Sequence, residues 1–472
     1  MPSFGRKLIV SDVDEVNSSN VVKVLADALG YHRLNAENSR MLYEYYRGNQ
    51  PILRRIKDVR PEIMNMCVLN HANEIVSFKV SYLLSNPIVY VGRSTSNVSE
   101  QINRLNEYMH IAGKPARDKE IADDFNICGN AYRMVLPNKR MLNEDEAPFE
   151  IYTLNPERTF IVYKNGLGEV PLCGVTYVTK ENGKERFSVY TPKKYFEIEN
   201  QSIRVNRPHA LGVVPIFEYC NNNARLGSFE IVITLLNAIN ALASNRIDAT
   251  EQAVQALMVF ENCDIDEETY DAMRAKGAIK IKSADCERSK VYSVGTELNQ
   301  ADQQVLMDAL YDAVIKICGM PSQGNGSTSD SSNNGAAITR NGWYHAEARA
   351  KDTELLWDEA EMKMLRLVLR ICRDLGAEPL RLFLKDIELK FTRRNYEDLL
   401  SKSQTFTTLM STGYTDITDA YAAAGMFPDS EAAAIRGKEW HEQQKESVAP
   451  AVPPTAGPQK MNTDDGGKGN EA

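Results

Sequence analysis

The feature that most constrains this sequence is a segment, residues 226–258, that carries no glycine or proline after Gly227. Its stretch ITLLNAINAL is apolar on almost every side of a helix, and the residues that follow are more polar. A helix that is apolar all round needs neighbours all round, because exposed apolar surface is unfavourable in water. We therefore predict a long helix that buries its outward faces against neighbouring subunits.

Two more long helices are predicted further along the chain. Residues 297–318 have helical texture, and residues 336–375 form one helical pattern without proline. The second of these helices would span roughly 60 Å at 1.5 Å per residue. Its pairs Glu347/Lys351 and Glu359/Lys363 have the favourable spacing and order.

The polar stretch PSQGNGSTSDSSNNG, residues 321–335, lies between those two helices. Its composition cannot bury enough surface to hold one conformation unaided. Asp330 is its only charged residue. A flexible loop of this kind could touch a DNA backbone without being trapped by the phosphates, because strong counterion-releasing contacts would stall a moving duplex.

The rest of the chain predicts a mixture of helices and strands. Helical spacing and stop signals predict N-terminal helices at residues 20–46, 63–84 and 98–112. Short β-branched and aromatic runs separated by turn residues predict a strand-rich section, residues 130–219. A small insert is predicted at 261–295, with a short acidic helix at 266–275 and strands from Ala278 and Val291. The C-terminal part is predicted to contain a strand from Leu382, short helices at 396–440 and a disordered tail from Ser447. The fold class is α+β, mainly α-helical.

Composition narrows the possible functions. The chain has 472 residues, 43% of them hydrophobic and 25% charged, so it can form a large core in several structural regions. Its net charge of -9 argues against a protein that grips nucleic acid over a broad basic surface. The N-terminal residues do not resemble a signal peptide, and no apolar segment reaches the roughly 20 residues of a bilayer span. The eight scattered cysteines form no CxxC pair, so we expect reduced cytosolic core residues.

Signatures of catalysis are almost absent. No Gly-Lys pair is followed by serine or threonine, which excludes a Walker phosphate loop. His441-Glu442 begins like a zinc-protease motif, but Lys445 occupies the position of the second histidine. We expect neither an enzyme, nor a metal site, nor a cofactor. One enzymatic alternative is a metal-dependent nuclease that uses the carboxylates around Asp264 and Asp266, although this cluster lacks the residues of a calcium loop.

Several segments in a fixed order resemble the portal proteins of tailed bacteriophages, specifically the siphophage portal family of Gram-positive hosts (Gp6-like). The likeness covers most of the chain. It is carried by YEYYRGNQPIL from Tyr43, NEIVSFKVSYLLSNPIVY from Asn73, VVPIFEYCNNNARLGSFEIVITLLNAIN from Val213, DIDEETYDAM from Asp264, ICGMPSQ from Ile317, and the ending IELKFTRRN of the segment that follows.

This resemblance implies a ring, usually dodecameric, at the unique capsid vertex. The ring is the conduit for double-stranded DNA during packaging and ejection. The resemblance also implies that terminase, a head-completion connector, and capsid and scaffold proteins dock on this ring. It further implies that the protein is assembled in the host cytoplasm and is then located in the virion. A capsid adaptor that oligomerises without a channel is the remaining alternative.

The resemblance also divides the chain into regions. They are a wing (1–225), stem helix one (226–258), a clip (259–296), stem helix two (297–320), a tunnel loop (321–335), a long helix with a wing strand (336–395), a crown (396–445) and a disordered tail (446–472).

Three sets of site residues follow from that division. The loop facing the DNA channel consists of Ser322, Gln323, Gly324, Asn325, Gly326, Ser327, Thr328, Ser329, Asp330, Ser331, Ser332, Asn333 and Asn334. The basic candidates for local DNA contact in the stem and clip are Arg246, Lys276, Lys280, Lys282 and Lys316. The acidic candidates for partner binding in the clip are Asp264, Asp266, Glu267, Glu268 and Asp271.

Overall fold

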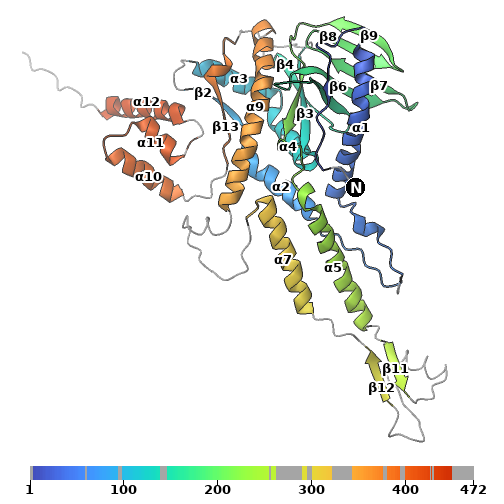
Figure 1. Cartoon of the computed structure of the whole chain (residues 1–472). Coiled ribbons are helices and arrows are strands. Elements are labelled where there is room, and N and C mark those ends of the chain that lie inside the picture. The colour runs from blue at the N-terminus through green and yellow to red at the C-terminus, as the bar shows by residue number, and fades with distance from the viewer. Residues whose placement is uncertain are drawn as a thin grey trace, which may run out of the picture. The chain divides into compact units, whose positions relative to one another are not determined.

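The computed structural model of the chain is shown in Figure 1. It describes residues 4–58, 61–93, 98–138, 146–254, 257–261, 290–294, 300–321, 343–375, 380–393, 399–425, 427 and 430–448. The chain divides into two units, Met1–Asp398 and Leu399–Ala472, which we describe separately. The fold is α+β, as predicted.

Four helices occur in the N-terminal part of the first unit: α1 (Val21–Tyr46), α2 (His71–Leu83), α3 (Ser99–Ile111) and α4 (Lys114–Cys128). The predictions at 20–46 and 98–112 are confirmed. The prediction at 63–84 is wrong in its first part, because α2 begins only at His71 and residues 64–70 form neither helix nor strand. Helix α4 was not predicted. It follows Gly113, whose φ of 70° is easily adopted only by glycine.

The strand-rich section predicted at 130–219 is confirmed. The largest sheet has the order β1-β5-β6-β7-β8-β9. Its strands are β1 (Val10–Ser11), β5 (Thr159–Lys164), β6 (Pro171–Thr179), β7 (Glu185–Tyr190), β8 (Lys194–Glu199) and β9 (Ser202–Pro208). Strand β1 pairs with β5 in parallel, and the other pairings are antiparallel. Helix α1 shares a core with this sheet, in which Val24 and Leu25 are buried with Phe160 and Phe196.

A second sheet, of order β10-β3-β4, forms the centre of the main core. It consists of β10 (Ile216–Cys220), β3 (Asn130–Pro137) and β4 (Phe149–Leu154). Helix α4 packs on it, and so does the long helix α9 (Trp343–Leu375). Trp357 of α9 lies edge-on to Phe125 and Tyr219, with ring centroids 5.6 and 5.2 Å away. Helix α9 is therefore anchored in the core by its middle.

The predicted ion pairs on α9 are present. Lys351 lies 3.9 Å from Glu347, and Lys363 lies 2.6 Å from Glu359. After α9, a short 3-10 helix (Leu384–Asp386) leads into β13 (Ile387–Lys390), which pairs antiparallel with β2 (Val89–Gly92). The strand predicted from Leu382 is thus confirmed in part, since the strand begins only at Ile387, after the 3-10 helix.

Two long helices, α5 (Ile233–Val254) and α7 (Gln300–Cys318), lie side by side in Figure 1. Both were predicted, but α5 is shorter than residues 226–258. A 3-10 turn (Glu230–Val232) precedes it, and residues 257–258 belong to strand β11 (Leu257–Glu261). Strand β11 pairs antiparallel with β12 (Lys290–Val294), which confirms the strand predicted from Val291.

The second unit contains α10 (Leu399–Ser411), α11 (Ile417–Ala424) and α12 (Ser430–Val448). The Asp416 carboxylate accepts a hydrogen bond from the Thr418 amide and caps α11. Phe406 stacks on Tyr421 at 4.6 Å, which joins α10 to α11. The short helices predicted at 396–440 are confirmed, but α12 continues to Val448, past the predicted start of the tail. Residues 449–472 lie outside the described part of the chain.

Candidate functional site: the two-helix hairpin

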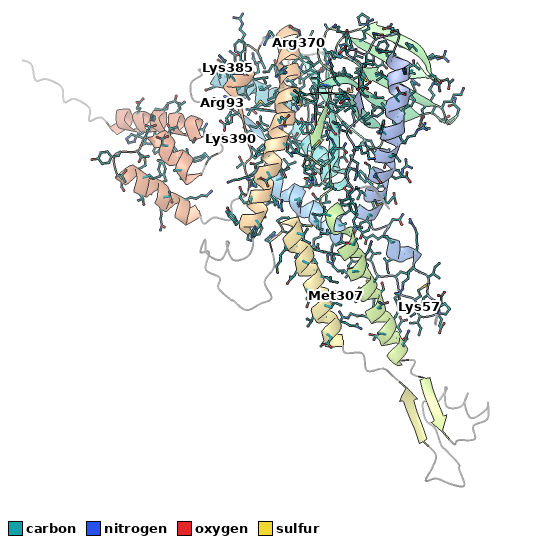
Figure 2. The ribbon with its side chains drawn as sticks, in the orientation of Figure 1. Lys57, Arg93, Met307, Arg370, Lys385 and Lys390 are labelled. Carbon is teal, nitrogen blue, oxygen red and sulfur yellow. The ribbon has the colours of Figure 1, made fainter. Side chains whose placement is uncertain are left out.

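Helices α5 and α7 form an antiparallel pair whose inner face belongs to the main core. Leu236 and Ile239 of α5 and Val314 and Cys318 of α7 are all buried there. Met307, labelled on α7 in Figure 2, also packs against this core. Farther along the hairpin the Arg246 guanidinium donates to the Gln304 side-chain oxygen at 2.6 Å. The hairpin is therefore tied together along its length by apolar and polar contacts.

One face of α5 carries a row of polar side chains that bind a neighbouring segment. Asn240, Ser244 and Asp248, spaced four residues apart, accept hydrogen bonds from the backbone amides of alternate residues. The donors and distances are Leu69 (2.8 Å), Cys67 (2.9 Å) and Asn65 (2.7 Å), in the same order. We call this set of three bonds the polar ladder.

The spacing of the polar ladder follows from backbone geometry. Four residues of helix advance about 6.0 Å, and two residues of extended chain advance about 6.6 Å. Every fourth side chain of α5 therefore meets every second amide of residues 65–69. These amides are satisfied by α5 and not by helical bonds of their own, which explains why the predicted helix at 63–84 does not begin there.

The two ends of the polar ladder are reinforced by further polar groups. Asn240 donates to the side-chain oxygen of buried Gln50 at 2.5 Å. At the other end Lys57 donates to the Asp248 carboxylate at 3.1 Å, and Figure 2 shows Lys57 beside α5. Although burial acts in the opposite direction, hydrogen bonds from Asn65 and Lys57 hold the pKa of Asp248 below its usual value. The ladder thus ends in an ionised carboxylate.

We expect Ser244→Ala to remove one rung of the polar ladder. The Cys67 amide would lose its acceptor, lowering the free energy of unfolding by about 1 kcal/mol. The measurement is hydrogen exchange at Cys67, which should become faster than in the parent chain. Thr250→Ala is the matched control, because the Thr250 hydroxyl also bonds a carbonyl one turn back on α5, that of Arg246. Equal exchange at Cys67 in both variants would contradict the ladder.

The outer side of α7 has no partner in the described part of the chain. Val305 is 68% exposed, Leu306 49% and Ile317 44%. On α5, Ile247 is 41% exposed. The polar row of α5 is covered by residues 65–69 of the same chain, so this face of the helix is not buried against a neighbouring subunit. The apolar surface that stays exposed lies mainly on α7.

Helix α7 ends in a left-handed turn that directs the chain out of the hairpin. Gly319, with φ of 68°, donates its amide to the Lys316 carbonyl at 3.2 Å, and the Met320 amide donates to Ile315 at 3.0 Å. This pair of bonds is a Schellman ending. Of the predicted cations, Lys316 is exposed and Arg246 is bound to Gln304.

The other predicted site residues lie outside the described residues. These are the loop residues 322–334, the cations Lys276, Lys280 and Lys282, and the acidic residues Asp264, Asp266, Glu267, Glu268 and Asp271. Their assignments stay predictions.

The entrance to α5 is held by a buried ion pair from the N-terminus. The Arg6 guanidinium lies 2.5 Å from the Glu230 carboxylate, and both side chains are almost fully buried. Glu230 also accepts the amides of Gly5 and Gly227, each at 2.8 Å. A side chain at Gly227 would place its first carbon 2.4 Å from the Ile127 carbonyl oxygen. The backbones therefore approach one another closely here because Gly227 has no side chain.

A second buried set of charges fixes α9 to α4 and β3. Arg133 lies 3.1 Å from Glu361 and 2.5 Å from Asp118, and Lys114 lies 2.6 Å from Asp118 and 3.2 Å from Glu361. All four side chains are buried. Two cations and two anions alternate, so the charges balance. We call these four residues the charge cluster.

Two tyrosines complete the charge cluster. The hydroxyls of Tyr90 and Tyr219 donate to the Glu361 carboxylate at 2.5 and 2.7 Å. Burial disfavours the ionised carboxylate, but Lys114, Arg133 and these two hydroxyls outweigh it and lower the pKa of Glu361 to about 2. This environment stabilises a charged carboxylate in the core and offers no free acid or base for catalysis.

The charge cluster and the polar ladder were both missed by the sequence analysis. The spacing of Asn240, Ser244 and Asp248 was a readable signal for the ladder, since three small polar residues share one helix face. For the charge cluster no comparable signal exists. Lys114 and Asp118 have the spacing of an ordinary surface pair, and only the tertiary structure places them against Glu361.

The described ranges were searched for metal-binding groups and for membrane-spanning helices. They contain no group of three or more His, Cys, Asp or Glu side chains placed to hold a metal ion. No helix in the same ranges combines the length and the apolar character needed to cross a bilayer.

Comparison with known proteins gives one family match. The family described as "Phage portal protein, SPP1 Gp6-like" matches residues 30–447. Two solved structures share 11% sequence identity with the chain. One is described as "Neck of empty GTA particle computed with C6 symmetry" and covers 75% of this chain and 90% of its own, with a TM-score of 0.41. The other, "Virion of native gene transfer agent (GTA) particle", covers 83% and 94%, with a TM-score of 0.42. No curated protein matches the sequence.

Proposed function

The chain belongs to the SPP1 Gp6-like family of phage portal proteins, and we propose that its copies form a ring at one capsid vertex through which double-stranded DNA enters and leaves. In this proposal the protein is a structural conduit without catalysis of its own. Terminase docks on it during packaging, and a head-completion connector docks on it afterwards. Capsid and scaffold proteins are its other partners.

The regions of the proposed subunit follow the order of the sequence. Helices α5 and α7 are the stem, and residues 259–296 between them are the clip. Residues 321–335 are the tunnel loop. Residues 1–225 and strand β13 form the wing, α9 is the long helix that runs from the channel to the wing, and the three helices of the second unit form the crown. The acidic residues of the clip, from Asp264 to Asp271, are proposed to face the terminase and the connector.

The observation that carries the ring is the outer side of α7, which has no partner among the residues that the structure describes. Leu306 and Ile317 are exposed on α7, while the inner side of the same helix is buried in the core. Contacts between different faces of identical subunits run head to tail and close into a ring when the rotation fits. A hairpin that is buried on one side and carries exposed apolar residues on the other suits such a contact.

The charge of the chain supports a conduit through which DNA passes, and not a protein that binds DNA tightly. The net charge is -9, and Asp330 is the only charge within residues 321–335. An acidic ring with a nearly neutral loop would repel phosphates overall and hold no counterion-releasing grip on them. Arg246 and Lys316 would make only local contacts with DNA. Arg246 already donates a hydrogen bond to Gln304, and Lys316 is a single exposed cation on α7.

Native mass spectrometry and negative-stain microscopy of the full chain test this proposal. We expect a closed ring with a central hole, and Leu306→Asp should prevent ring formation because it places a charge in the subunit contact. Leu167→Asp is the control, because Leu167 is a fully exposed leucine in the turn between β5 and β6. A monomer or dimer at every concentration, or metal-dependent cleavage of plasmid DNA that is lost when Asp264 and Asp266 are replaced, would contradict the proposal.

Deletion of residues 327–333 tests the proposed tunnel loop. We expect rings of normal size, because the loop is too polar to contribute to subunit packing. DNA packaging should fall, because the channel would lose the segment that lines the duplex. A packaging assay with purified rings measures this, and normal packaging would remove the tunnel loop from the proposal.

A further inference from the structure

A hollow of about 440 Å³ lies where the top of the hairpin meets α2 and α9. Its lining includes Ile231, which precedes α5, Ile317 near the end of α7, and Leu355 of α9. All three side chains are exposed, so they form an apolar rim that is continuous with the unpartnered side of α7.

Two cations line the same hollow without a counterion. Lys79 of α2 and Arg349 of α9 have no hydrogen-bond or ion-pair partner for their side chains in the part of the chain that the structure describes. Burial lowers the pKa of Lys79; the neighbouring Cys318 acts in the opposite direction, and the charge of Arg349 lowers the pKa as well. Asp352 is the one carboxylate among the described lining residues, and it is exposed and pairs with neither cation.

The position of Arg349 depends on the end of α7. A first side-chain carbon at Gly319 would lie 2.7 Å from Cγ of Arg349. Because glycine has none, the Arg349 stem passes directly over the end of α7, on the same side as Lys79. Lys79 is half-buried and Arg349 is exposed, so two like charges lie close together beside an apolar rim, and a carboxylate placed between them would relieve their repulsion.

The exposed side of α7 offers suitable carboxylates. Helical geometry places Leu306 and Ile317 along one edge of this side, and Val305, Asp308 and Asp312 along the other. Asp308 and Asp312 are exposed. Head-to-tail packing brings one edge of a subunit against the opposite edge of the next. In a ring, equivalent residues of all subunits lie at the same height along the ring axis. Asp312 lies about 9 Å along α7 from Cys318, which lines the hollow, so Asp312 of one copy is close in height to the hollow of the next.

We infer that this hollow is a docking site for a second copy of the chain, in which Lys79 and Arg349 bind a carboxylate from the Asp308/Asp312 edge of the neighbouring α7. The inference rests on the proposed ring. It assigns a specific anchor to the subunit contact. A protein carboxylate suits this pair of cations better than a duplex backbone, because the apolar residues beside them favour a protein surface, whereas protein–DNA contacts are more polar.

Zero-length cross-linking with a carbodiimide tests the contact directly. Rings are assembled from equal amounts of unlabelled and ¹⁵N-labelled full-length chain, so that an amide between Lys79 and a carboxylate can be assigned within or between copies by mass. We expect mixed-isotope peptides that join Lys79 to Asp308 or Asp312. Intact rings whose only Lys79 product is an intrachain link to Asp352 would overturn the inference and leave the ring standing. A wild-type chain that forms no ring would instead refute the proposed function.

Charge variants provide the second test. We expect Lys79→Gln and Arg349→Gln to raise the concentration at which rings dissociate by about tenfold or more, the effect of removing one partner of a desolvated charge pair. Arg366→Gln, an exposed cation elsewhere on α9, is the control. Arg349→Glu should block assembly, and Arg349→Glu combined with Asp312→Arg should restore it. Unchanged assembly of the two glutamine variants with weaker DNA retention would identify a phosphate site and overturn the inference.

Discussion

Glu361→Ala is expected to lower the free energy of unfolding by about 3–5 kcal/mol. The substitution leaves Lys114 and Arg133 in the core with only one carboxylate, that of Asp118, between them. An uncompensated buried charge is far more costly than a missing surface pair. Denaturant unfolding followed by the fluorescence of buried Trp357, a neighbour in the same core, measures the change.

The matched control for this prediction is Glu359→Ala. Glu359 lies on the same helix and also pairs with a lysine, Lys363, but both side chains are largely exposed. Its loss should change stability by no more than about 0.5 kcal/mol. Similar losses in the two variants would show that the charge cluster contributes no more than a surface ion pair.

The same carboxylate predicts a dependence of stability on pH. The pKa of Glu361 is about 2 in the folded chain, below the value of about 4.3 for an unfolded glutamate. A lowered folded pKa stabilises the fold above the unfolded value, and this contribution is lost as pH falls from about 4.3 towards 2. The stability of Glu361→Gln should therefore fall less steeply than that of the parent as pH falls over this range.

Arg6→Ala is the second substitution with a large expected effect. It removes the buried partner of Glu230, whose carboxylate then keeps only the amides of Gly5 and Gly227. We expect a loss of about 3 kcal/mol in the free energy of unfolding, at the lower end of the range for broken buried pairs because these amides stay in place. Limited proteolysis should also cut the N-terminal residues sooner, since Arg6 joins them to the start of α5.

Lys7→Ala is the control for the N-terminal anchor. Lys7 is the next residue and a cation, but its side chain is exposed. Its removal should leave both the unfolding curve and the proteolysis rate unchanged. If the Arg6 variant behaved like the Lys7 variant, the N-terminal segment would not contribute to holding α5. This outcome would be notable because Arg6 precedes the residues that match the family.

How far the sequence predicts the fold depends on where each segment finds its hydrogen bonds and apolar contacts. Helices α1 and α3 were predicted because their apolar periodicity reflects local packing. Residues 64–70 were mispredicted, because their amides are satisfied by side chains far away in sequence. Helix α4 was overlooked because its buried charges, Lys114 and Asp118, mask its apolar face.

The candidate site was predicted unevenly for the same reason. The family and the hairpin followed from sequence order and helical texture. The polar ladder and the hollow around Lys79 and Arg349 did not, because they join segments that are separated by many residues. Lys79 lies on α2 and Arg349 on α9, and no pattern in either helix indicates the other.

The polar ladder has a further consequence for the hairpin of α5 and α7. Each rung pairs a helical advance of about 6.0 Å with an extended advance of about 6.6 Å, so the two scales drift apart by about 0.6 Å per rung. The acceptors of α5 and the amides of residues 65–69 therefore align over only a few hydrogen bonds, and in one register. Sliding residues 65–69 along α5 by one turn would put Asn240 or Asp248 opposite the wrong amide. Residues 65–69 are thereby held in one position along α5, so the hairpin would be placed identically in every copy of the chain.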